Sequence, residues 1–172
     1  MRNSMNRHAR HSLGAELLLG GLAGAAATWG MGQVTSFLYE KEAKAVRQRE
    51  DAARGGETAD ETAAGRVAGA MGTSLDQRAR KRAGTAMHFA IGIGAGALYG
   101  ALRERLPGAD AARGLAYGTG MWLVLDEGAN VALGFTPGPG AFPWQTHARG
   151  LAGHLAYGLV LDGVLRLGEH VA

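Results

Sequence analysis

The sequence predicts an all-α fold: a four-helix transmembrane bundle with a short amphipathic helix in its first connector. Four apolar stretches of about 20 residues, at 17–39, 84–102, 114–134 and 148–167, are each long enough to cross a bilayer as a helix. Small residues recur at every fourth position in these stretches, and no stretch shows the alternating pattern of a strand. We therefore expect the 172 residues to form a single integral membrane domain with a hydrophilic connector at residues 40–83.

The composition favours membrane helices over the alternative, a soluble helical bundle. The chain has 29 Gly but only four Phe and four Tyr, whereas a soluble core is normally built from Leu, Ile, Val and Phe. Membrane helices pack instead through small residues that let their backbones approach each other. The surplus of arginine flanks the apolar stretches, as lipid headgroups favour, without the interleaved aromatic residues of RNA-binding proteins. We therefore expect the lipid bilayer as a partner and no nucleic acid.

The first predicted span, residues 17–39, contains no charged residue. Gly20, Gly24, Thr28 and Gly32 follow one another at intervals of four, which places them on one helix face suited to close contact. A basic segment precedes this span, but the apolar run is too long for a signal peptide and lacks a good cleavage site. We therefore expect an uncleaved first helix.

The connector begins with a charged stretch at residues 40–54. We expect this stretch to continue the first helix as a solvated segment until Gly55 and Gly56 break it. Thr58 followed by Glu61 has the pattern of a capping box, which predicts a short amphipathic helix after it. That helix either lies at the membrane surface or packs on neighbouring helices.

The second span carries the longest stripe of small residues, in which His88 stands among Gly84, Gly92, Gly96 and Gly100. The turn that follows is short, so the second and third spans should be antiparallel neighbours. We expect the glycine stripes to serve helix packing within the chain first, and homo-oligomer formation second.

The third span ends before a segment at residues 135–144 that holds three of the four prolines and cannot continue a helix. In the fourth span Asp162 and Arg166 lie four positions apart and are expected to pair. His147 is expected to pack in the loop beside Pro143 and Trp144. The histidines near the termini are expected at the surface: His8, His11 and His170.

A buried polar site is predicted where three spans carry polar residues at similar depth: His88, Asp126, Glu127, Asn130 and His154. Measured from the connector side, these residues lie about 6 to 12 Å into their helices at the helical rise of about 1.5 Å per residue. Charged groups within a membrane are costly, so these side chains should face the interior of the bundle.

Three interpretations of this polar site remain open. The side chains either only hydrogen-bond one another and set the helix register, or form a pathway for protons or a small solute, or hold a metal or haem. The candidate metal ligands are His88, Asp126, Glu127 and His154, although the Glu-x-x-His spacing of di-iron bundles is absent. No catalytic residue is predicted, because the motifs of hydrolases and nucleotide-binding proteins are absent. The chain also lacks cysteine, which excludes disulfides and thiolate metal sites.

Several short motifs resemble a known family. Residues 88–107, the Gly-Phe-Thr-Pro at 134–137, the Pro143-Trp144 pair and the Gly-His-Leu at 153–155 resemble the YagU-like bacterial inner-membrane proteins, a family with a domain of unknown function. The stretch that ends in Trp29 is similar as well. The resemblance covers the four spans and not the charged connector. It implies a multi-span helical protein of the bacterial inner membrane that is linked to survival in acid. In these relatives a histidine stands near the position of Asp126, so the resemblance does not support a fixed set of metal ligands.

Overall fold

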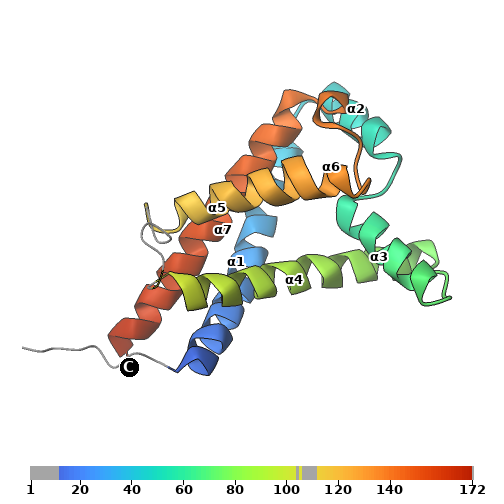
Figure 1. Ribbon diagram of the computed structural model, residues 1–172. Helices are drawn as coiled ribbons and strands as arrows, with labels where there is room; N and C mark the ends of the chain where they lie inside the picture. The colour runs from blue at the N-terminus through green and yellow to red at the C-terminus, as the bar shows by residue number, and fades with distance from the viewer. Residues whose placement is uncertain (1–11, 104, 106–111, 172) are drawn as a thin grey trace, which may run out of the picture.

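The computed structural model describes residues 12–103, 105 and 112–171 (Figure 1). The predictions for residues 1–11, which include His8 and His11, and for the turn at 106–111 lie outside these residues, as does the side chain of His170. The described chain forms helices and no strand, so the all-α prediction is confirmed. The helices are α1 (Leu13–Lys41), α2 (Lys44–Arg54), α3 (Ala59–Ala70), α4 (Gln77–Leu102), α5 (Leu115–Met121), the π-helix η1 (Trp122–Ala129), α6 (Asn130–Ala132), the 3-10 helix η2 (Pro139–Ala141) and α7 (Trp144–Val171).

Local side chains determine where several helices begin. The hydroxyl of Ser12 accepts the N–H of Ala15 at the start of α1, and Asp76 accepts the N–H of Ala79 at the start of α4, at 2.7 Å. The predicted capping box at the start of α3 is confirmed, with both the Thr58 and the Glu61 side chains bonded to the opposite backbone N–H.

The prediction that α1 continues into the charged stretch is wrong. The chain leaves the helix at Glu42, whose ψ of 147° is extended, and α2 starts as a separate helix at Lys44. The predicted break after α2 is confirmed: Gly55 and Gly56 have φ of 65° and 90°, a region that favours glycine. The break at Glu42 lets α2 turn back over the rest of the chain, and this turn places charged residues against the ends of α1 and α7.

Glycines bring the long helices into backbone contact. A Cβ atom on Gly24 would lie 2.5 Å from the carbonyl oxygen of Gly92 and 3.0 Å from the Cα of Gly96, so α1 and α4 touch through their main chains. In the same way Gly118 of α5 lies against the backbone of His154 in α7. The predicted use of the stripes for packing within the chain is confirmed at these contacts. Gly32 is an exception, since a Cβ atom there would meet nothing within 4 Å.

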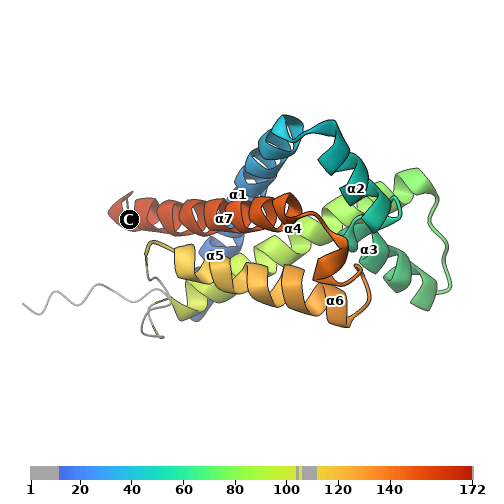
Figure 2. The ribbon, with the colours of Figure 1, turned by 90° about the horizontal axis from the view of Figure 1, so that it is seen from above.

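The long helices cross one another rather than forming a parallel stack (Figures 1 and 2). The chain runs up α1 and back down α7, and α4 crosses α1 where their glycines meet. Ion pairs of Arg105 with Glu16 and of Arg103 with Glu169 bring the start of α1 and the ends of α4 and α7 together.

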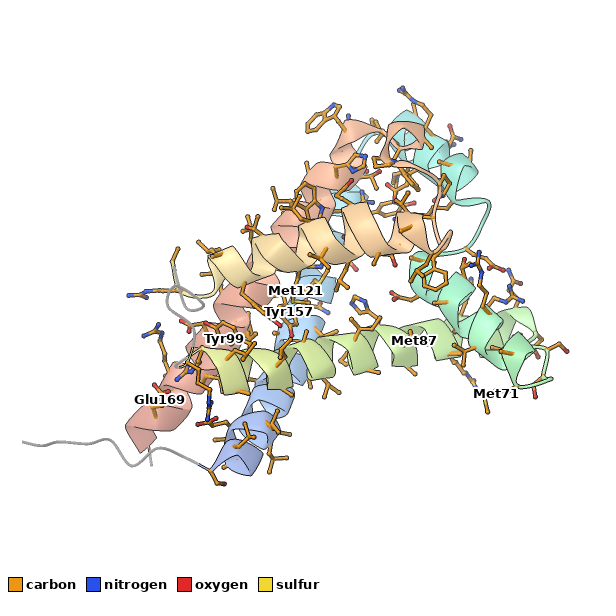
Figure 3. All side chains as sticks on the ribbon, viewed as in Figure 1. Met71, Met87, Tyr99, Met121, Tyr157 and Glu169 are labelled. Carbon is orange, nitrogen blue, oxygen red and sulfur yellow. The ribbon has the colours of Figure 1, made fainter. Side chains whose placement is uncertain are left out.

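The core is made of small and aromatic side chains, while large aliphatic side chains point outward. Ala23, Ala27, Tyr99, Tyr157 and Leu161 form the buried cluster, and Figure 3 shows Tyr157 in the space between α4 and α5. On the outer face of α1 four large apolar residues are 58 to 65% exposed: Leu18, Leu22, Trp29 and Phe37. Among the described helices, α4 is long and apolar enough to cross a membrane. The four-helix transmembrane bundle stays a prediction.

α5, η1 and α6 follow one another as one continuous helical segment, which diverges from α4. The connector, residues 40–83, closes the wide end of the space between this segment and α4. Near the narrow end the Tyr117 hydroxyl donates to the carbonyl oxygen of Ala95 at 2.7 Å. At the wide end Arg66 of α3 donates to the carbonyls of Leu133 and Gly134, at 2.6 and 2.7 Å, which satisfies the end of α6. α3 packs on α4, as one of its two predicted placements requires, and a position at the membrane surface stays a prediction.

Candidate functional site

A cavity of about 740 Å³ lies between the diverging helices and the connector. Its walls come from α1, α2, α3, α4, α5, η1, α6 and α7, so residues far apart in sequence face the same space. All five residues of the predicted polar site line this cavity: His88, Asp126, Glu127, Asn130 and His154. Five carboxylates, three histidines and two arginines face the cavity in total.

The two adjacent carboxylates of the site lie in the π-helix η1. The N–H of Asn130 donates to the carbonyl of Leu125, five residues earlier, which is the hydrogen bond of a π-helix. Because a π-helical turn contains more residues than an α-helical turn, neighbouring side chains diverge less. This geometry lets Asp126 and Glu127 both face the cavity. Such turns are uncommon and often occur at functional sites.

Three histidine–carboxylate pairs surround the cavity. The Nδ1 of His154 lies 3.6 Å from Oδ2 of Asp126, and the Nδ1 of His147 lies 2.6 Å from Oε1 of Glu127. The Nδ1 of His88 lies 3.2 Å from Oδ2 of Asp60 in α3. Each pair joins two different helices, because the carboxylates belong to η1 and α3 and the histidines to α4 and α7.

These pairs correct two predictions. His88 was expected to contact Asp126 or Glu127, but its closest carboxylate is Asp60, because α3 folds over the start of α4 while η1 diverges from it. His147 was expected to pack in a loop, but it lies in the first turn of α7 and faces the cavity. Its Nε2 also lies 3.1 Å from the carbonyl oxygen of Pro139, so each ring nitrogen faces an acceptor.

The buried ring of His154 is held by its own helix. Its Nδ1 lies 3.0 Å from the carbonyl oxygen of Gly150, one turn earlier, and the side chain is 4% exposed. Asp126 is 36% exposed by comparison, so its carboxylate borders the open part of the cavity. Gly150 keeps this contact open, since a Cβ atom there would lie 3.2 Å from Oδ2 of Asp126.

A buried ion cluster at the connector end was not predicted. Arg149 of α7 donates to both carboxylate oxygens of Glu50 in α2, at 2.5 and 2.6 Å, and also to Glu42. Arg54 pairs with Glu50, and the hydroxyl of Thr146 donates to it at 2.8 Å. Glu50 is fully buried, so the expectation that its stretch is solvated fails at this residue, although most of the stretch is exposed. No local pattern could have revealed this cluster, because its partners are 99 positions apart.

The surroundings of Glu50 determine its charge. Burial by itself raises the pKa of this carboxyl, but the hydrogen bond from Arg149, the charge of Arg54 and the hydrogen bond from Thr146 outweigh burial and hold the pKa below its usual value. Glu50 is therefore a carboxylate in the folded protein and pairs with both Arg54 and Arg149.

Replacing Glu50 by Gln should reduce the acid sensitivity of the fold. Because the folded pKa lies below the unfolded one, the ionised group contributes stability that is fully present above about pH 4.3 and is lost as pH falls through the folded pKa. Melting temperatures measured in detergent at descending pH should therefore fall less steeply below about pH 4.3 in Glu50→Gln than in the parent. Glu57→Gln, at a half-exposed pair with Arg80, is the control and should keep the parent slope. Equal slopes in all three proteins would contradict the assignment.

The predicted metal ligands do not gather into one ligand set. Within the described part of the chain, no three histidine, aspartate or glutamate side chains are grouped closely enough to hold one metal ion. The structure divides the candidates between separate pairs, with His88 bonded to Asp60 and His147 bonded to Glu127.

A second polar cluster lies at the opposite end of the bundle. The predicted pair is confirmed: the Nε of Arg166 lies 2.5 Å from Oδ2 of Asp162. Tyr99 donates to the other oxygen of Asp162 at 2.8 Å, which links α4 to α7. Asp162 does not line the cavity, so this cluster holds the helices together away from the candidate site.

Comparisons with protein-family models, curated proteins and solved structures find no match for this chain. The resemblance to the YagU-like proteins therefore stays a prediction.

Proposed function

We propose that this chain is an integral membrane protein whose polar cavity binds a small cationic solute and exchanges protons with it. The observation that carries the proposal is the cavity itself, where carboxylates of α3 and η1 face histidines of α4 and α7. The bacterial inner membrane is the proposed location, as the resemblance to the YagU-like proteins implies.

The distribution of apolar side chains supports the membrane location. Large apolar residues are exposed on each long element, for example Leu22 on α1, Leu98 on α4, Val124 on η1 and Leu167 on α7. The helices meet through glycine and alanine instead. In water such apolar faces would have to be covered, whereas in a bilayer they contact lipid while small residues bring the helices together.

The charges around the cavity support a cationic solute. Arg54 and Arg149 are both bonded to Glu50. Within the described residues, the ion pairs found for Asp60, Asp126 and Glu127 are with histidines. When these histidines are neutral the lining is acidic, and a cation that enters can take the place of a proton shared within a pair.

The alternative is a structural role, in which the polar pairs only join the helices. The 3.6 Å separation of His154 from Asp126 and the exposure of Asp126 to the cavity favour the binding site, because a purely structural pair would be closed and shielded.

Removing the charge of Asp126 should weaken cation binding. We expect purified protein in nanodiscs to bind methylammonium, measured by calorimetry, and Asp126→Asn to bind it about tenfold more weakly or worse, because a hydrogen bond to a charged group contributes about 1.5–3 kcal/mol. Binding should also weaken as the pH is lowered, since protons compete for the carboxylates.

Asp76→Asn is the matched control, because it removes the same charge outside the cavity and asparagine still caps α4. Equal affinities for the parent and Asp126→Asn, or no methylammonium binding at any pH, would contradict the binding proposal. Recovery of folded protein from the aqueous fraction without detergent would contradict the membrane location.

A further inference from the structure

A second, apolar cavity adjoins the polar one. It has a volume of about 570 Å³ and lies between α4 and the helix of α5 and η1, which diverge here. Nine of its ten lining residues are glycine, alanine, methionine or branched aliphatic residues. The tenth is Tyr117, whose hydroxyl is already donated to the carbonyl of Ala95. This second cavity, called the groove below, therefore offers hydrocarbon contacts to a ligand and no free side-chain hydrogen-bonding group.

The two cavities share part of their walls. Ile91 of α4, Met121 of α5 and Leu125 of η1 line both of them. Figure 3 shows Met121 on the side of α5 that faces α4. The polar cavity and the apolar one are therefore neighbours that meet at these three side chains. Each cavity by itself has a volume typical of ligand pockets, about 300–1,000 Å³.

The open side of the groove faces the same surroundings as the outer apolar residues. Leu98 and Val124 line the groove and are 52% and 64% exposed. Glycines at the groove, Gly94 and Gly120, leave it wide, because a Cβ atom at either position would meet nothing within 4 Å. In the proposed membrane setting this side opens laterally to the hydrocarbon interior.

We propose that the ligand of the site is a cationic amphiphile with one hydrocarbon chain. Its amine headgroup lies among Asp60, Asp126 and Glu127, and its chain lies in the groove between α4 and η1. Two observations select this occupant: the acidic lining of the polar cavity matches a cationic headgroup, and the groove that adjoins it at Ile91, Met121 and Leu125 offers only hydrocarbon contacts. The inference rests on the proposed function and specifies its ligand class.

The test compares probes that carry the charge and the chain together or separately. Dodecylamine carries both, methylammonium only the charge and dodecanol only the chain. Binding is measured in phosphatidylcholine nanodiscs for the parent, for Gly120→Leu, which fills the groove, and for Gly163→Leu. Gly163 is the matched control, since a Cβ atom there also meets nothing within 4 Å and the position lies outside both cavities. Because every variant is measured in the same bilayer, partition of the probes into lipid cancels between them.

We expect Gly120→Leu to weaken dodecylamine binding by about tenfold or more, because the leucine side chain would occupy the space in the groove that the hydrocarbon chain needs. The same change should leave methylammonium binding unaltered, and Gly163→Leu should alter neither. Dodecanol should bind far more weakly than dodecylamine. If Gly120→Leu does not fold, Gly94→Leu fills the groove from α4 and carries the same expectations.

The outcomes separate this inference from the proposed function. If methylammonium binds and Gly120→Leu leaves dodecylamine binding intact, the amphiphile is overturned and the cation site stands. Dodecanol binding as tight as that of dodecylamine would also overturn it, because the headgroup would then contribute nothing. A change in oligomeric state in Gly120→Leu would identify a second copy as the occupant of the groove instead. If none of the probes binds, both proposals fall.

Discussion

Arg149→Met should cause the largest loss of stability of any single side-chain change in the described structure. The substitution removes the bidentate partner of the fully buried Glu50 and one partner of Glu42. Breaking a buried ion pair from one side costs about 3–5 kcal/mol, because the remaining charge stays buried without its partner. For a chain of this length that loss corresponds to a fall in melting temperature of about 10 °C or more in detergent.

Two further variants separate the buried pair from general effects of losing an arginine. Arg80→Met removes a half-exposed partner of Glu57 and should cost less than about 1 kcal/mol. The double variant Glu50→Gln/Arg149→Met should recover part of the loss, because no buried carboxylate is then left without its bidentate partner. A melting temperature for Arg149→Met equal to that of Arg80→Met would show that the cluster does not hold α2 to α7. If Arg149→Met gives no folded protein, Arg149→Lys keeps the charge and should show an intermediate loss.

Gly96→Ala should lower the free energy of unfolding by about 3 kcal/mol. A Cβ atom at Gly96 would lie 2.5 Å from the Cα and 2.9 Å from the N of Gly24, so α1 and α4 would have to move apart. Backbone atoms cannot rotate away as a flexible side chain can, and the loss therefore exceeds the gain of about 1 kcal/mol that alanine brings to a helix. Thermal unfolding followed by circular dichroism in detergent measures the difference.

The same helix provides a control with the opposite sign. Gly94 is two residues away, and a Cβ atom there would meet nothing within 4 Å. Gly94→Ala should therefore be neutral or stabilise by up to about 1 kcal/mol, since only the helix propensity changes. Equal effects of the two substitutions would mean that α1 and α4 do not cross at Gly96.

The π-helix explains why the depth of the site could be predicted better than its contacts. Counting residues along each span placed His88, Asp126 and His154 at similar depth, and all three line one cavity. The partner of each histidine depends on how its helix is rotated and tilted. One extra residue per turn at η1 and the divergence of α4 from α5 alter both quantities. No sequence pattern at η1 or α4 indicates the rotation or the tilt of these helices.

The sequence by itself determined the features that depend on neighbours within about one helical turn. The capping box of Thr58 and Glu61, the break at Gly55 and the pair of Asp162 with Arg166 involve residues no more than four positions apart. The glycine stripes are equally local, because a spacing of four places them on one helix face whatever the rest of the chain does.

Only the tertiary structure decided which faces meet and what the connector does. The folding of α3 onto α4 pairs His88 with Asp60, and the turn at Glu42 buries Glu50 against Arg149. From the sequence, charged residues in a polar stretch are predicted to be solvated, because the sequence alone contains no information on a partner 99 positions away. The physical reason is that ion pairs and cavities form where helices cross. The crossing follows from the summed packing of small residues along the whole length of each helix rather than from any local pattern.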